Sequence, residues 1–189
     1  NEPGYMRPHV FVTGEKMAGL RSLGEVGKAI RSGHAANIWQ DLLEKVDRES
    51  VEPCWTPRSP LPERYEKHVK NASREFELVG MTCSRIIDGA LAALVLNERR
   101  YAEPVLGQIE TLFDESQWPE IDDAAHLRGG AHCSLRRGQF ATAIGLAYDW
   151  LHGLLTDEER HRLIKGFDAR FVRQFRTAVE TPDDWVRKR

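Results

Sequence analysis

Residues 136–160, RRGQFATAIGLAYDWLHGLLTDEER, decide the fold of this chain. Thr156, followed three residues later by Glu159, matches a capping box, in which a hydroxyl and a carboxylate cap the first turn of a helix. The apolar residues before it recur at helical spacing, which predicts a helix with one apolar face. These residues are Phe140, Ala143, Ile144, Ala147, Tyr148, Leu151, Leu154 and Leu155. The stretch therefore predicts two helices joined by a short turn.

Helical spacing of apolar residues continues through most of the chain, and the only β-like run is the short Val10, Phe11 and Val12. We expect a proline-rich loop at residues 51–62, because four prolines cannot lie inside one helix. Residues 116–130 are expected to form a second loop, and Pro182 to end the last helix. Helices are predicted at residues 13–22, 34–48, 76–96, 101–115 and 140–155, and a last helix begins after the Thr156 cap and carries its apolar face at residues 163–179.

The fold class predicted from this pattern is all-α, with residues 1–189 in a single helical domain of at least three antiparallel hairpins. Two architectures fit such a chain, a superhelical repeat solenoid and a closed toroid of helical hairpins. The chain has no clean fixed repeat period, and this absence favours the toroid. Ile87, Leu91, Leu94, Ile144, Ala147, Leu151 and Phe167 are predicted to be buried together.

Composition limits the possible partners. Of the 189 residues, 41% are hydrophobic and 30% charged, and the net charge of −2 gives no reason to expect nucleic acid as a partner. No uninterrupted apolar run approaches the roughly 20 residues that span a bilayer, so no membrane is expected. Three separated cysteines with no CxxC spacing do not suggest zinc, and Cys83 is expected to be a packed free thiol.

Three segments, in order, resemble the heparinase II/III-like polysaccharide lyases, which include alginate lyases. Residues 7–13, RPHVFVT, are similar to that family's opening HPRLFFT, and residues 90–112, ALAALVLNERRYAEPVLGQIETL, are similar to one of its helical hairpins. Residues 141–160 are the closest match, on the pattern AxALAYDWLxxxLTxEER. The resemblance implies an incomplete (α/α) toroid, of which this chain would be the N-terminal part, followed by a β-sandwich domain.

The resemblance also implies a periplasmic or secreted enzyme that cleaves uronic-acid polysaccharide by β-elimination. In this reaction a Tyr or His removes the proton next to the carboxylate and no cofactor is needed, while Asn, His or Arg donors stabilise the charge. The family's first catalytic motif, of the Asn-Asn-His type, would follow the region of Trp185, and the chain contains no such motif. The catalytic residues are therefore unknown, and the chain alone is expected to be inactive.

The residues around the start of the 140–155 helix are the candidates for binding an anionic polysaccharide. Arginine and amide side chains suit a carboxylate, and a loop tryptophan can stack on a sugar ring. The candidates are Arg136, Arg137, Gln139, His132 and Trp118, and ordinary surface charge or core packing is the alternative for each. His126 and His132 are six residues apart, which does not suit a metal pair on one helix face, so no metal is expected.

Other polar residues are interpreted as structural. Tyr148 and Asp149 are expected to contribute core packing and a structural hydrogen bond, with an acid/base pair as the alternative. Arg160, Arg162, Arg170, Arg173 and Arg176 are expected to form a solvated basic face.

Two other functions remain open. A tetratricopeptide-like scaffold that binds a protein partner would suit residues 90–112, although the chain lacks the 34-residue period of such repeats. An unsaturated glucuronyl hydrolase would need paired aspartates in its cleft. The pairs Asp122 with Asp123 and Asp183 with Asp184 are adjacent in sequence, so their side chains are not expected to form such a dyad.

Overall fold

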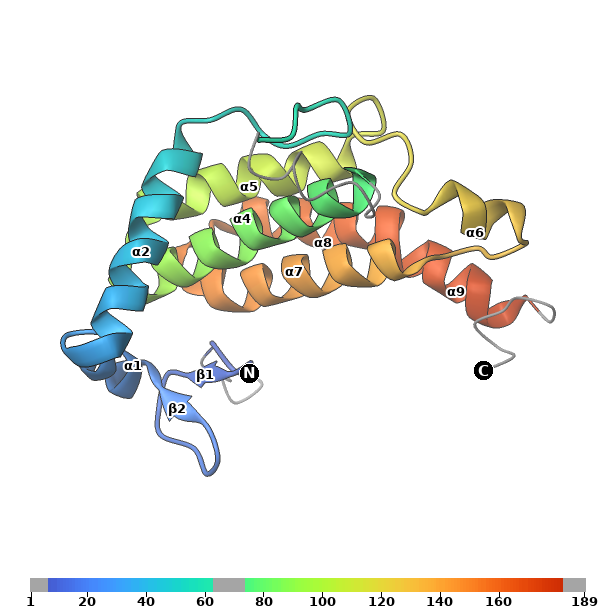
Figure 1. The fold of residues 1–189 in the computed structure, drawn as a ribbon. Helices are drawn as coiled ribbons and strands as arrows, with labels where there is room; N and C mark the ends of the chain where they lie inside the picture. The colour runs from blue at the N-terminus through green and yellow to red at the C-terminus, as the bar shows by residue number, and fades with distance from the viewer. Residues whose placement is uncertain (1–6, 63–73, 182–189) are drawn as a thin grey trace.

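The computed structural model describes residues 7–62 and 74–181 and is predominantly helical, which confirms the predicted all-α class. Helix α4 (Arg74–Leu96) lies at the centre of the bundle, between α5 (Arg99–Phe113) and α7 (Leu135–Leu151) (Figure 1). Small residues allow these helices to approach closely, and a side chain at Gly89 would lie 2.6 Å from Cγ2 of Val105.

Among the residues that the structure describes, two antiparallel hairpins form the bundle, where at least three were expected. Helix α4 turns into α5 through Asn97, whose φ of 54° is the left-handed conformation typical of a helix end. Helix α7 continues through a 3₁₀ turn (His152–Leu154) into α8 (Asp157–Phe167). Helix α2 (Gly33–Ser50) instead crosses the end of the bundle steeply (Figure 1).

The start of α8 confirms the predicted capping box. The Thr156 hydroxyl accepts a hydrogen bond from the Glu159 amide at 3.2 Å, and the Glu159 carboxylate accepts one from the Thr156 amide at 2.9 Å. Arg99 also donates to this carboxylate, and the resulting ion pair joins α5 to α8. These hydrogen bonds, chiefly those from Arg99, lower the pKa of Glu159 to about 2.

The N-terminal segment differs from the sequence prediction. Residues 13–22 do not form a helix: β1 (Val12–Thr13) and β2 (Arg21–Ser22) pair in parallel, and the first helix is α1 (Leu23–Ala29). Ser22 forms the cap at the start of α1, with Glu25 as the second member of the capping box. Thr13 instead donates its hydroxyl hydrogen to the Glu15 carbonyl within the intervening loop.

Two further differences concern the C-terminal half. The loop predicted at residues 116–130 contains a short helix, α6 (Ala124–Arg128). The last helix is interrupted, because a π-helical turn (Asp168–Val172) separates α8 from α9 (Arg173–Glu180). Helix α9 ends before residue 181, and the expected stop signal at Pro182 lies outside the described residues, as do Asp183, Asp184 and Trp185. The proline-rich segment 51–62 is a loop, as predicted.

Four of the seven residues predicted to form the core are buried, and the other three are half-buried at its margin. Leu94, Ile144, Ala147 and Leu151 are buried in one cluster, whereas Ile87, Leu91 and Phe167 are half-buried and pack against it. Helix α4 is long and apolar enough to cross a membrane, and 56% of its most apolar part is buried inside the bundle. A core helix of a water-soluble protein has the same length and composition, so α4 carries no argument for a membrane.

Candidate functional site

The N-terminal end of α7 is attached to the preceding loop by two buried arginines. Arg137 makes bidentate hydrogen bonds to Asp122, with Nε 3.0 Å from Oδ2, and its Nη1 donates to the carbonyl of Arg170. Nη2 of Arg136 lies 2.7 Å from Oδ2 of Asp123 and also pairs with Glu75. Asp122 accepts a further hydrogen bond from the Ser134 amide at 2.7 Å.

These contacts change the expected roles of Arg136 and Arg137. Both side chains are buried, and their positive charges are compensated by carboxylates of the chain itself. They primarily hold the 122–134 loop on the helix rather than offering free cations to a polyanion. The two neighbouring aspartates thus serve separate arginines, in agreement with the expectation that they form no catalytic dyad.

Trp118 is buried and therefore cannot stack on a sugar ring, as the sequence had suggested it would. The side chain is only 4% exposed, and its ring contacts Phe140 edge to face at 5.2 Å. Its indole Nε1 donates to the carbonyl of Trp55 at 3.0 Å. Trp118 therefore covers the core, which is the alternative that the sequence left open.

The expected solvated basic face of the last helices is only partly correct. Arg170 is largely buried and donates to the carbonyls of Leu112 and Trp118, so it joins the π-helical turn to the end of α5. Arg160 donates to the carbonyls of His152 and Leu155 and closes the turn before α8. Arg162, Arg173 and Arg176 are exposed, as expected.

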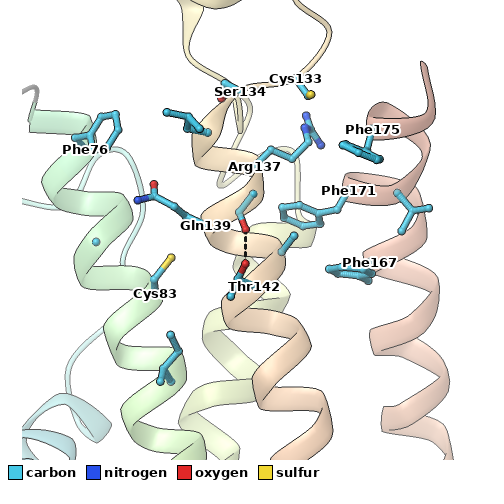
Figure 2. Close-up of a pocket in the computed structure, with 16 residues that line it drawn as sticks. Phe76, Cys83, Cys133, Ser134, Arg137, Gln139, Thr142, Phe167, Phe171 and Phe175 are labelled. Atoms are coloured by element: carbon cyan, nitrogen blue, oxygen red, sulfur yellow. Dashed lines mark hydrogen bonds between the residues drawn. The ribbon is translucent and has the colours of Figure 1, made fainter. Parts of the chain in front are cut away.

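Gln139 and Arg137 border a cavity of about 880 Å³ on the outer face of α7. Figure 2 shows Gln139 on the side toward α4, near Cys83, and Arg137 on the opposite side, beside Phe171 and Phe175. Phenyl rings and small residues form most of the surface. The Thr142 hydroxyl is satisfied by the Gly138 carbonyl at 2.9 Å, whereas the Gln139 amide makes no hydrogen bond within the described residues. Gln139 is thus an available polar group in a mainly apolar cavity.

The remaining candidates at this end are histidines and a cysteine. His132 is exposed, and the side chain of His126 lies outside the described part of the chain. Within that part, no group of three or more His, Cys, Asp or Glu residues could hold a metal ion. Cys83 is a free thiol, and burial raises its pKa to about 12, so it remains protonated at neutral pH.

The C-terminal end of α7 carries a second polar cluster, built on Asp149. Its buried carboxylate accepts hydrogen bonds from the Arg7 guanidinium at 3.0 Å and from the amides of His9 and Val10 at 2.8 and 3.0 Å. The Trp150 indole donates to the Val10 carbonyl at 2.9 Å. The structural hydrogen bond that the sequence predicted for Asp149 is therefore confirmed, with the N-terminal segment as its partner.

This attachment fixes a tight turn in the N-terminal segment. The Val12 amide donates to the Val10 carbonyl at 2.8 Å, and Phe11 between them has a φ of 63°. Three-residue turns with positive φ are rare and strained for residues other than glycine. The Phe11 side chain is 68% exposed, so the core gains little from it.

Arg7, Tyr148 and His152 lie together beside Asp149. The Arg7 guanidinium is 5.2 Å from the centre of the Tyr148 ring, and the His152 ring contacts Tyr148 edge to face at 5.6 Å. Burial lowers the pKa of His152, and the positive charges of Arg7 and Arg160 lower it further. Sequence reasoning singled out Tyr148 but missed His152, which lies four residues further along the same stretch, and Arg7, which only the chain fold brings to residue 149.

Comparison with known proteins finds no family model that matches the chain and no curated protein that is significantly similar to it.

Proposed function

We propose that this chain is the helical, substrate-binding portion of a polysaccharide lyase that cleaves uronic-acid polymers by β-elimination. The proposal rests on the ordered resemblance of residues 7–13, 90–112 and 141–160 to the heparinase II/III-like lyases. The helical class agrees with it, and the hairpins would form part of an incomplete (α/α) toroid. The remaining toroid and a β-sandwich domain would supply the catalytic Tyr and His, in the periplasm or outside the cell.

In the structure, the observation that supports a binding role is the position of the Gln139 amide. It lies without a hydrogen-bond partner in the described residues, in a cavity bordered by four phenyl rings, Phe76, Phe167, Phe171 and Phe175. Ligand sites commonly combine such apolar surface with a few polar groups that fix orientation. Gln139 would hydrogen-bond a sugar hydroxyl or carboxylate, while the rings would contact the apolar faces of the sugar. Its role would be binding rather than proton transfer.

Direct binding tests this role. A purified uronate oligosaccharide should bind the chain in titration calorimetry, and Gln139→Ala should weaken binding about tenfold. Gln174→Ala, an exposed glutamine on α9 outside the cavity lining, serves as the matched control and should bind like the parent. Absence of binding by the parent chain, or equal affinity of parent and Gln139→Ala, would refute the role of this cavity.

Activity gives an independent test. The chain alone should release no unsaturated product, which absorbs in the ultraviolet, because the catalytic motif of the family is not in this sequence. Turnover by the purified chain would overturn the division between binding and catalysis.

The apolar surface of the same cavity favours a second candidate, a scaffold that binds an amphipathic helix of a protein partner. Gly138, Ala141 and Thr142 form a low surface between the rings, and Phe76 and Phe175 remain 42% and 54% exposed. Under this alternative, replacing Phe76 and Phe175 together with serine would abolish binding of an amphipathic helical peptide and leave uronate binding unchanged. Under the lyase proposal, the same double variant would weaken uronate binding.

A further inference from the structure

Arg7 differs from Arg137 in the number of its guanidinium donors that are used. Its only hydrogen bond within the described residues joins Nη1 to Oδ1 of Asp149, so Nε and Nη2 have no partner there. These two nitrogens form one edge of the guanidinium, which can bind a carboxylate through two parallel hydrogen bonds. The Arg7 side chain is 37% exposed, so this edge is not sealed inside the core.

Two further polar groups beside Arg7 are unused. The Tyr148 hydroxyl and the His152 ring nitrogens make no hydrogen bond within the described part of the chain, and both side chains are half-buried. The contacts of Tyr148 with Arg7 and with His152 hold the three side chains as one cluster. A guanidinium edge, a phenol and an imidazole therefore lie together with donors available.

Asp149 positions this cluster without competing for the same donors. Oδ1 accepts from Arg7 and Oδ2 accepts from two backbone amides, so the carboxylate is occupied on both oxygens and is only 3% exposed. A rigid arginine costs less ordering free energy when it binds a ligand than a freely rotating surface arginine. The charged groups that act on His152 are Arg7, Arg160 and Asp149, and two of these three are positive.

We propose that Arg7, Tyr148 and His152 form a carboxylate-binding site at the C-terminal end of α7. The Nε and Nη2 edge of Arg7 would bind the two carboxylate oxygens, and Tyr148 and His152 would donate to the same group or to its neighbouring hydroxyl. The identification of the carboxylate as that of a uronic acid rests on the proposed function. The affinity of the three side chains for a carboxylate does not depend on the proposed function.

The site predicts a pH dependence of binding. His152 is held neutral by burial and by Arg7 and Arg160, and a bound carboxylate would compensate those positive charges. The imidazole would then accept a proton more readily in the complex than in the free protein. Binding should therefore strengthen as the pH falls toward the lowered pKa of His152 in the free protein.

The test follows the His152 ring by nuclear magnetic resonance while a uronate trisaccharide, acetate or an uncharged trisaccharide is added. We expect the uronate to shift the His152 signals and the uncharged sugar to leave them unchanged. Tyr148→Phe, which keeps the ring, should weaken uronate binding about three- to tenfold. His152→Gln should do the same and remove the pH dependence. His161→Gln and Arg176→Gln, on exposed side chains of α8 and α9, are the matched controls.

The outcomes separate this site from the proposed function. A shift of the His152 signals by acetate but not by the uronate would keep the carboxylate site and refute a uronate ligand. A shift by the uronate that persists in Gln139→Ala would show that the site acts independently of the cavity. Unchanged His152 signals with both carboxylates, or full affinity in Tyr148→Phe and His152→Gln, would overturn the proposal.

Discussion

The two ends of α7 both form ion pairs, but the helix supplies the positive charge at one end and the negative charge at the other. At the N-terminal end the helix supplies Arg136 and Arg137, and the loop supplies the aspartates. At the C-terminal end the helix supplies Asp149, and the N-terminal segment supplies Arg7 together with two backbone amides. Each arrangement attaches an irregular segment to the same helix, and each buries one carboxylate, that of Asp122 or that of Asp149.

The difference lies in what remains available to a ligand. Arg137 uses Nε, Nη1 and Nη2 within the chain, so burial and pairing leave it little capacity for another partner. Arg7 uses Nη1 alone. Between Arg7 and Arg137, the exposure of the guanidinium and the number of donors already used, rather than the charge, decide which one can bind an external carboxylate.

The largest effect on stability is expected when the ion pair at the N-terminal end of α7 is broken. Arg137→Met should lower the free energy of unfolding by about 3–5 kcal/mol, because Asp122 would keep a buried charge without its partner. Reversible urea unfolding measures this loss, and Arg176→Met is the exposed control, expected within about 0.5 kcal/mol of the parent. A loss below about 1 kcal/mol would show that the pair is hydrated.

A smaller loss is expected at the other end. Asp149→Ala removes the acceptor of two backbone amides and of Arg7, and we expect a loss of about 2 kcal/mol, since each unsatisfied buried donor costs about 1–3 kcal/mol. Hydrogen exchange at the amides of residues 9 and 10 should accelerate in this variant, while exchange in α4 follows only the global change in stability. Unchanged protection of these two amides would contradict the attachment described above.

The two ends of α7 should also differ in how they make the free energy of unfolding depend on pH. The pKa of His152 is lowered in the folded protein, so the unfolded chain takes up the proton first as the pH falls. The contribution of His152 to stability is therefore unchanged above about pH 6.5 and becomes unfavourable below it, down to the lower pKa of the folded state. Chemical unfolding at pH 7.5 and pH 5.5 measures the loss, which should be smaller in His152→Gln than in the parent. An equal loss in both proteins would assign it to other groups.

The smallest effect is expected in the tight turn. Phe11→Gly relieves a positive φ but also gives the unfolded chain more freedom, so we expect a change in unfolding free energy within about 0.5 kcal/mol of zero. Phe11→Val should be less stable than Phe11→Gly, because a β-branched residue is poorly tolerated at positive φ. The two unfolding free energies, compared directly, check the conformation of this turn.

Local sequence signals predicted those parts of the fold that depend on near neighbours. The apolar period located α4, α5 and α7, and the capping box at Thr156 and Glu159 formed as expected, because its two partners are three residues apart. Thr13 failed as a cap because Ser22, with Glu25 after it, is the residue that begins the helix. The π-helical turn left no mark on the apolar pattern, so the sequence predicted a continuous helix there.

The candidate site was less predictable because its pairs join distant residues. Asp149 could be interpreted as a structural acceptor, but its partner lies 142 positions away. Arg136 and Arg137 were expected to be available donors because nothing in their own segment showed that Asp122 and Asp123 would fold back onto them. Gln139 borders a cavity that the sequence did not predict, and whether it binds substrate stays a prediction.

The π-helical turn between α8 and α9 has a consequence for how this protein can change by insertion and deletion. A π turn holds one more residue than an α turn, so deleting a single residue within residues 168–172 would restore a regular helix. The extra residue is taken up within the turn itself, so the side chains after the deletion would keep their directions around the helix axis. Phe175 would still border the cavity, and the bundle of α4, α5 and α7 would remain intact. The π turn is therefore a place where the chain can change in length by one residue without redirecting the residues that line the cavity.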